Sequence, residues 1–119
     1  MKKILCAEGN PDIAEAVRIM LSGAGFNIEV APSGKDCMQK IKANTFDLFL
    51  LDVKLPDMSG WDIFEELKSH NKTPNVALMS TIPITNERRN HLQEEGIDDY
   101  ITKPFKKSDL IKRIKAILT

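Results

Sequence analysis

The sequence predicts a single α/β domain built on a five-stranded parallel sheet with helices on both faces. Its 119 residues suffice for one hydrophobic core and leave no room for a second. Short apolar runs alternate along the chain with segments whose apolar residues recur at helical spacing, without linker or repeat. Strands separated by such helices pair in parallel through right-handed crossovers, and helices then cover both faces of the sheet. A closed eight-unit barrel is excluded because the chain is too short.

The first two strand–helix units have clear start and stop signals. Residues 4–7 are uniformly apolar, which predicts a buried strand. The helix that follows has Asn10 as its N-cap, a proline at its first position and Gly25 at its end. Residues 26–30 alternate between apolar and polar side chains, which indicates a strand nearer the edge of the sheet. Ser33 is expected to cap the second helix.

The third unit contains the most apolar strand. Residues 46–51 run directly into Asp52, so this carboxylate is expected at the end of a central strand. A loop over residues 53–59 ends at Gly60 and leads into a third helix with helically spaced apolar residues.

The last two units differ in how firmly their helices should be held. Pro74 precedes a fourth strand at residues 76–79, and residues 99–102 form a short fifth strand. Between them, residues 85–94 are strongly polar and Leu92 is almost their only apolar anchor, so this helix should be weakly held. Its charged residues are expected to form a solvated face: Glu87, Arg88, Arg89, Glu94 and Glu95. The final helix carries a full apolar stripe: Leu110, Ile111, Ile114, Ile117 and Leu118.

Composition narrows the function classes. The formal net charge is zero, which indicates neither a nucleic-acid-binding nor a membrane-binding surface. No apolar stretch approaches the roughly 18 residues of a membrane span, and Glu8 interrupts the N-terminal apolar run before it could serve as a signal peptide. We therefore expect a cytoplasmic protein. Cys6 and Cys37 are expected to be reduced core residues, and His70 and His91 to be solvated.

Polar side chains should converge at one edge of the sheet. The flavodoxin-like strand order 2-1-3-4-5 is the obvious candidate, and ligands of such sheets bind outside the carboxyl ends of the strands. The residues that follow strands 1, 3, 4 and 5 are Glu8, Gly9 and Asn10; Asp52; Ser80 and Thr81; and Lys103. Crowded carboxylates need a counter-charge, which Lys103 and a divalent cation with oxygen ligands would supply. Any chemistry is therefore expected to centre on Asp52.

Three segments resemble response-regulator receiver domains. Residues 50–60, LLDVKLPDMSG, resemble the phosphoacceptor segment of that family, and residues 98–105, DDYITKPF, resemble its fifth strand and Lys-Pro turn. Residues 4–13 resemble its opening. The similarity covers the whole chain, so the resemblance implies a CheY-like receiver domain of two-component signalling over residues 1–119, which we expect to stand alone.

The resemblance implies that the domain functions in a phosphorelay and is not an enzyme. At most it would catalyse the transfer of a phosphoryl group to itself and the hydrolysis of that group. Asp52 would accept a phosphoryl group from a sensor histidine kinase or phosphotransfer protein, Lys103 and a hydroxyl would bind that group, and Tyr100 would be the switch. Counting back from Lys103 by the usual spacing of the family selects Thr81 as the hydroxyl. Counting forward from the apolar run at residues 76–79 selects Ser80, which we prefer. An unknown output protein would bind the face formed by the fourth helix, fifth strand and fifth helix. Neither direct nucleic-acid binding nor membrane binding is expected.

The metal site departs from the family pattern. The resemblance implies Mg²⁺ held by an acidic pair after the first strand, by Asp52 and by the Lys54 backbone carbonyl. Here the pair is Glu8-Gly9, and Gly9 offers no ligand, so binding should be weak, with Asn10 as a further candidate ligand. The alternative is a pseudo-receiver that binds its partner without phosphorylation. A flavin carrier of the same fold is disfavoured because no Gly-, Ser- or Thr-rich phosphate loop follows the first strand.

Overall fold

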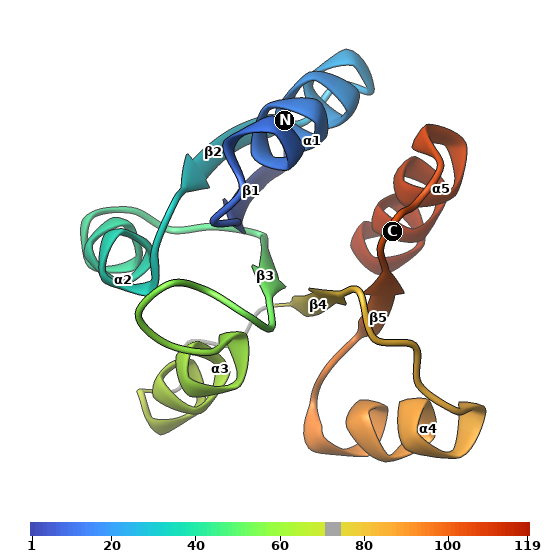
Figure 1. The fold of residues 1–119 in the computed structure, drawn as a ribbon. Coiled ribbons are helices and arrows are strands. Elements are labelled where there is room, and N and C mark those ends of the chain that lie inside the picture. Colours follow the sequence, from blue (N-terminus) through green and yellow to red (C-terminus); the bar gives the residue numbers. More distant parts are fainter. Residues whose placement is uncertain (71–74) are drawn as a thin grey trace.

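The chain folds into a parallel sheet sandwiched between helices (Figure 1). The structure is a computed structural model that describes residues 1–70 and 75–119, so Pro74 lies outside the described residues. The strand order is β2-β1-β3-β4-β5, as predicted. Along the chain the elements are β1 Lys3–Ala7, α1 Pro11–Gly23, β2 Asn27–Ala31, α2 Gly34–Ala43, β3 Leu48–Asp52, α3 Gly60–Ser69, β4 Val76–Ser80, α4 Asn86–Glu95, β5 Asp99–Thr102 and α5 Lys107–Leu118. Within the described ranges, no helix has the length and apolar character that crossing a membrane requires.

Side-chain caps fix where the helices begin. Asn10 and Ser33 accept backbone N–H groups from the first turns of α1 and α2, as expected. Ser59 and the third residue of α3 cap one another reciprocally. Helix α1 ends at Gly23, two residues before Gly25, whose φ of +97° is left-handed and turns the chain into β2. Strand β5 has the predicted bounds, and the other strands differ from theirs by one or two residues, a normal margin for element boundaries.

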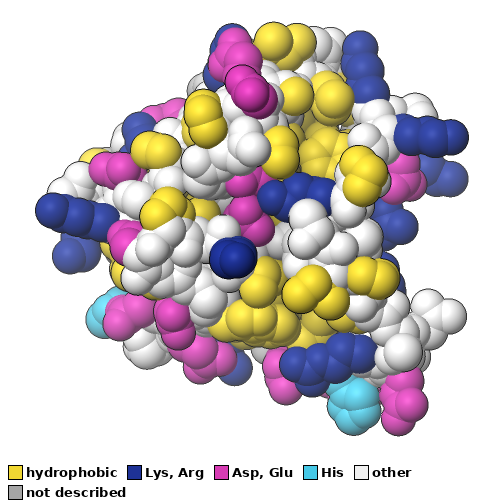
Figure 2. Space-filling view, in the orientation of Figure 1, with side chains coloured by type: hydrophobic (Ala, Val, Ile, Leu, Met, Phe, Trp, Pro, Cys, Tyr) yellow, Lys and Arg dark blue, Asp and Glu magenta, His cyan; other side chains and the backbone are white. Residues whose placement is uncertain are grey.

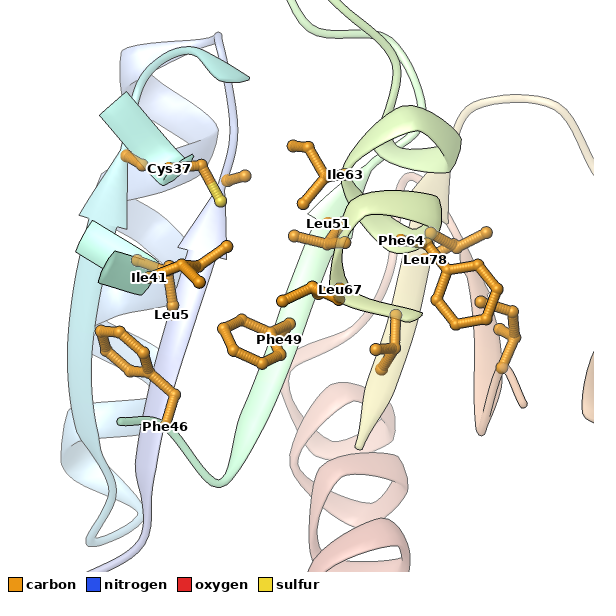
Figure 3. Packing of buried hydrophobic residues seen from close by; sticks show 14 of the residues in the cluster. Leu5, Cys37, Ile41, Phe46, Phe49, Leu51, Ile63, Phe64, Leu67 and Leu78 are labelled. Atoms are coloured by element: carbon orange, nitrogen blue, oxygen red, sulfur yellow. The ribbon is translucent and has the colours of Figure 1, made fainter. Parts of the chain in front are cut away.

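Alternation along the strands divides the core into two layers. Phe49 and Leu51 of β3 face α2, α3 and α4, whereas Leu48 and Leu50 face α1 and α5. Figure 3 shows the first layer, where side chains of α2 and α3 pack over β1, β3 and β4. Because both faces are covered, the strands are apolar throughout, and polar groups can collect only where the strands end.

Helix α4 contributes least to this core. Leu92 is its only buried residue, whereas α3 buries Gly60, Ile63, Phe64 and Leu67. The prediction of a weakly packed fourth helix is therefore confirmed. Since apolar burial stabilises by roughly 25 cal/mol per Å², a helix with one buried anchor opens at a lower free energy than its neighbours.

We expect the backbone amides of α4 to exchange with solvent at least about tenfold faster than those of α1 and α5, because local opening of α4 exposes little apolar surface. Native-state hydrogen exchange followed by NMR measures this directly. Equal protection of α4 and α5 would show that contacts other than apolar burial hold α4 as firmly as the rest.

Candidate functional site

The carboxyl ends of four strands line a single cavity. Glu8 follows β1, Asp52 and Ser80 end β3 and β4, and Lys103 follows β5. All four border a cavity of about 730 Å³. Figure 2 shows acidic side chains beside a basic one in a hollow near the middle of this face, surrounded by hydrophobic side chains. The topology thus brings together residues that are up to 95 positions apart in the sequence.

Lys103 bridges the two carboxylates of the cavity. Its Nζ atom lies 2.6 Å from Oε1 of Glu8 and 3.1 Å from Oδ2 of Asp52. The side chains of Lys103, Glu8 and Asp52 are only 9 %, 2 % and 8 % exposed, so the protein itself must balance their charges. Two carboxylates and one ammonium leave one negative charge when all three are ionised.

The pKa values of this group follow from burial and from its internal contacts. Burial raises the pKa of Glu8, the neighbouring Asp52 carboxyl raises it further, and the hydrogen bonds from Lys103 and the Asn10 backbone N–H act in the opposite direction. Burial alone would lower the pKa of Lys103, but its hydrogen bonds to Glu8 and Asp52 outweigh burial and raise this pKa above the usual value. Lys103 therefore stays charged, and Glu8 is inclined to take up a proton as the pH falls.

Backbone groups of the adjoining loops orient both carboxylates. The Lys54 N–H donates to Oδ1 of Asp52 at 3.2 Å, and the Asn10 N–H donates to Oε2 of Glu8 at 3.1 Å. The side-chain oxygen of Asn10 accepts two N–H groups of α1, at 2.9 and 3.2 Å. Asn10 is therefore engaged as a helix cap in this structure, which reduces its availability as a metal ligand.

The two candidate hydroxyls occupy different environments. Ser80 is 6 % exposed, and its Oγ accepts the backbone N–H of Ile82 at 3.0 Å. Thr81 also borders the cavity but is exposed. The Tyr100 ring is buried, and its hydroxyl donates to the Ile82 carbonyl at 2.7 Å. Ser80 and Tyr100 thus hold the same residue of the β4–α4 loop from its two sides.

The oxygen donors of the cavity have the chemistry that Mg²⁺ requires. Mg²⁺ binds proteins through one or two carboxylates and keeps several waters, and Glu8 and Asp52 provide two carboxylates beside the Lys54 backbone. Residues 1–70 and 75–119 contain no group of three or more Asp, Glu, His or Cys side chains that could hold a metal ion. A Cβ atom on Gly9 would lie 3.1 Å from Cδ of Pro56, so the loop after β3 packs closely where a further acid would stand.

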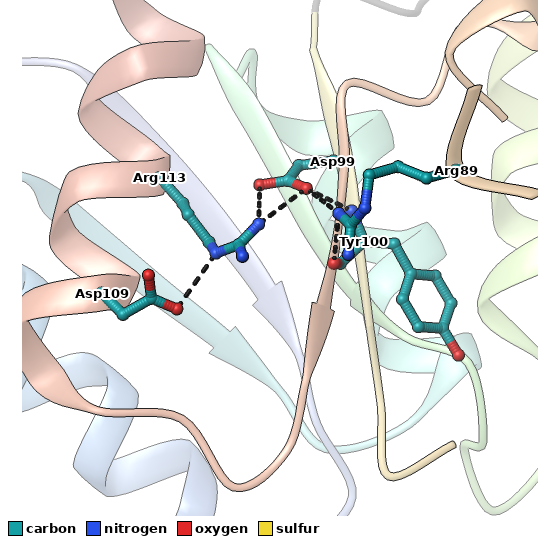
Figure 4. A network of polar contacts seen from close by, with 5 residues as sticks. All are labelled: Arg89, Asp99, Tyr100, Asp109 and Arg113. Atoms are coloured by element: carbon teal, nitrogen blue, oxygen red, sulfur yellow. Dashed lines mark hydrogen bonds and ion pairs between the residues drawn. The ribbon is translucent and has the colours of Figure 1, made fainter. Parts of the chain in front are cut away.

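One polar network was not anticipated from the sequence (Figure 4). Asp99, at the start of β5, binds Arg113 of α5 at 2.9 Å and Arg89 of α4 at 2.5 Å. Arg89 also donates to the backbone carbonyl of Tyr100 at 2.8 Å. The expectation that Arg89 lies on a solvated face is therefore wrong, since its side chain is 25 % exposed and lies against β5. The partners are 10 and 14 residues apart on separate elements, beyond any helical spacing that could have revealed them.

The sequence matches a known protein family and curated relatives. A family model described as "Response regulator receiver domain" matches residues 4–115. The regulatory protein VanRB of Enterococcus faecalis is 34% identical over 116 residues, which are 98% of this chain and 52% of that protein. The chain thus spans about half the length of the curated relatives that it matches.

Solved structures agree with this similarity. The receiver domain of the Francisella response regulator 1452 superposes with a TM-score of 0.89 at 27% identity, covering 99% of this chain and 97% of that one. The response regulator TrrA of Thermotoga maritima, solved in complex with Mg²⁺ and BeF, superposes with a TM-score of 0.83 at 27% identity, covering 99% of this chain and 100% of that one.

Replacing Lys103 with methionine is expected to lower the free energy of unfolding by about 3 kcal/mol near neutral pH, because two buried carboxylates lose their counter-charge. The folded pKa of Glu8, already raised, should rise further. The folded state then binds a proton more tightly than the unfolded state, so the loss should shrink as the pH falls from about 8 to about 5.

Urea titrations of Lys103→Met across this pH range measure the effect. Lys106→Met, at an exposed lysine three positions on, is the matched control and should change stability little. A pH-independent loss would show that the methionine side chain perturbs packing and that uncompensated charge is not the cause.

Proposed function

This chain belongs to the family of response regulator receiver domains of two-component signalling, and from that premise we propose that Asp52 is its phosphoacceptor. The observation that carries the proposal is a carboxylate at the end of the central strand, in an open cavity, paired with one buried lysine. A sensor histidine kinase or a phosphotransfer protein would be the donor. The domain would act as a phosphorylated switch rather than as an enzyme with a substrate of its own.

The transfer itself requires little from the protein beyond placement and charge. An oxygen of Asp52 attacks phosphorus of a phosphohistidine, the P–O bond forms as the P–N bond breaks, and the imidazole leaves. Lys103, already 3.1 Å from Oδ2, moves from the carboxylate to a phosphoryl oxygen as the negative charge shifts outward. Ser80 or Thr81, at the rim of the same cavity, then donates a hydroxyl to another phosphoryl oxygen.

Mg²⁺ is the cofactor that this donor set supports. When bound, it supplies positive charge to the phosphoryl oxygens during transfer. Glu8, Asp52 and the Lys54 backbone carbonyl would hold it, and Asn10 is the least favoured candidate because its side chain caps α1. The Mg²⁺ complex of TrrA supports this choice by homology. Binding is expected to be weak because Gly9 adds no charged oxygen.

The output surface is proposed to be the face formed by α4, β5 and α5. Ser80 and Tyr100 both form hydrogen bonds with the backbone of Ile82, at the start of the loop to α4. Movement of the Ser80 hydroxyl toward a phosphoryl group would therefore release or retighten this loop. The weak apolar packing of α4 lets the change spread, and Arg89 joins α4 to the backbone of Tyr100 (Figure 4). The partner is expected to be a protein rather than nucleic acid or membrane, in the cytoplasm.

A pseudo-receiver is the second candidate, favoured by Gly9 alone. If two protein carboxylates hold Mg²⁺ too weakly at cellular concentrations, Asp52 would stay unmodified and the same face would bind its partner constitutively. Labelling by a small phosphodonor separates the two functions.

Asp52→Asn is expected to abolish phosphoryl acceptance while leaving the fold intact, because the amide is a poor nucleophile of nearly the same shape. Intact-mass spectrometry after incubation with acetyl phosphate and Mg²⁺ should show a gain of about 80 Da on the wild type only. Asp47→Asn, before the opposite end of β3, is the control and should label like the wild type. Equal labelling of Asp52→Asn would move the acceptor elsewhere, and an unlabelled wild type would favour the pseudo-receiver.

Gly9→Asp is expected to tighten Mg²⁺ binding by about tenfold, or roughly 1.4 kcal/mol, because it adds a charged oxygen to the cavity. Trp61 fluorescence, next to the loop after β3, can follow the titration. Gly9→Asn has the same shape without the charge, so it controls for the close approach of Pro56. An unchanged midpoint in Gly9→Asp would mean that the aspartate cannot reach the ion.

A further inference from the structure

The loop between Asp52 and α3 is closed on itself. Lys54 and Ser59 form an isolated bridge across its base, and the Gly60 N–H donates to the Val53 carbonyl at 3.0 Å. At its tip, the Leu55 N–H donates to the Met58 carbonyl at 3.2 Å. These hydrogen bonds couple the tip of the loop to its base, so a shift of the tip would displace the Lys54 N–H that orients Asp52.

Asp57 joins the tip of this loop to a different helix. Its two carboxylate oxygens accept the backbone N–H groups of Gly34 at 2.7 Å and Lys35 at 2.9 Å, at the start of α2. Ser33, the N-cap of α2, accepts the Asp36 N–H, so Asp57 satisfies the two preceding donors that a helix start leaves unpaired. A carboxylate also suits the positive end of the helix dipole. These backbone hydrogen bonds hold the pKa of Asp57 below its usual value.

Close packing accompanies this contact. A Cβ atom on Gly34 would lie 2.1 Å from Cγ of Met58, so the methionine occupies the space that a side chain on Gly34 would fill. Leu55, in the same loop as Met58, is buried in the core layer under α2 and α3. On the other side, Pro56 lies against Gly9 of the β1–α1 loop. The loop thus rests on α2 and on the β1–α1 loop at once (Figure 1).

We propose that Asp57 is a positioning residue for phosphoryl transfer: it clamps the β3–α3 loop to the N-terminus of α2 and thereby holds Lys54 and Asp52 in register with the cavity. The inference rests on the proposed function of Asp52. Asp57 does not touch the reacting atoms. Its contribution comes from limiting the positions of a loop whose backbone donates to Asp52 and carries a proposed metal ligand, since a misplacement of about 1 Å at a reacting centre can cost about a hundredfold in rate.

The test compares Asp57→Ala with Asp57→Asn and Asp36→Ala. Asp57→Asn keeps an oxygen that can accept the Gly34 N–H, so it should retain the clamp in part. Asp36→Ala is the matched control. It removes a carboxylate from the first turn of α2 that is hydrogen-bonded to Ser33, whereas Asp57 reaches this turn from the loop. Asp57→Ala should label with acetyl phosphate at least about fivefold more slowly than the wild type at equal Mg²⁺, whereas the two other variants should stay within about twofold.

Amide NMR supplies the readout that a general loss of stability would not produce. In the wild type, the Gly34 and Lys35 amide shifts should titrate together at a pH below the usual range of an aspartate, and this titration should vanish in Asp57→Asn. Hydrogen exchange at Leu55 and Gly60 should be faster in Asp57→Ala than in Asp36→Ala.

Wild-type labelling rates in a folded Asp57→Ala variant would overturn the positioning role. Equal exchange at Leu55 and Gly60 in Asp57→Ala and Asp36→Ala would overturn the clamp itself. If the wild type does not label at all, the proposed function fails, and the exchange comparison still decides whether the clamp exists.

Discussion

The pairing of Lys103 with Glu8 and Asp52 is the interaction on which the rest of the site depends. It joins the ends of β1, β3 and β5 through three side chains that are largely buried. Two buried carboxylates without a cation would repel each other and lose their solvation, so the lysine stabilises the arrangement of all three loops. The remaining negative charge would favour the proposed Mg²⁺, and addition of a phosphoryl group would redistribute the contacts of Lys103. Lys103 therefore both stabilises the folded site and, in the proposed function, binds the phosphoryl group.

Helix α4 is held to the sheet by different forces from the other four helices. Helices α1, α2, α3 and α5 bury apolar stripes, whereas α4 buries only Leu92 and reaches β5 through the ion pair of Arg89 with Asp99. Apolar packing is insensitive to small shifts in direction, but a hydrogen-bonded ion pair depends on alignment. The one helix that is held mainly by polar contacts thus adjoins Ile82 and Tyr100, where a signal from Ser80 would arrive.

Small residues determine how closely the neighbouring elements approach the loop that follows β3. Gly34 leaves room for Met58, and Gly9 leaves room for Pro56, so the β3–α3 loop packs against two neighbours whose side chains are missing. At Gly9 this close fit coincides with the loss of a charged oxygen near the cavity. Tight packing of the loop and the proposed weak binding of Mg²⁺ would then be two consequences of the same glycine.

Hydrophobic periodicity and cap residues in the sequence were enough to predict the alternation of strands and helices and the weak fourth helix. With the strand order usual for such sheets, they also predicted that Glu8, Asp52, Ser80 and Lys103 meet at one edge. These follow from local patterns and from the handedness of crossovers, which act over a few residues at a time. Only the tertiary structure decided that Arg89 binds Asp99 and that Asp57 accepts backbone N–H groups at the start of α2. Such contacts join residues on different elements, and no sequence spacing encodes them because their distances depend on how helices pack and loops close.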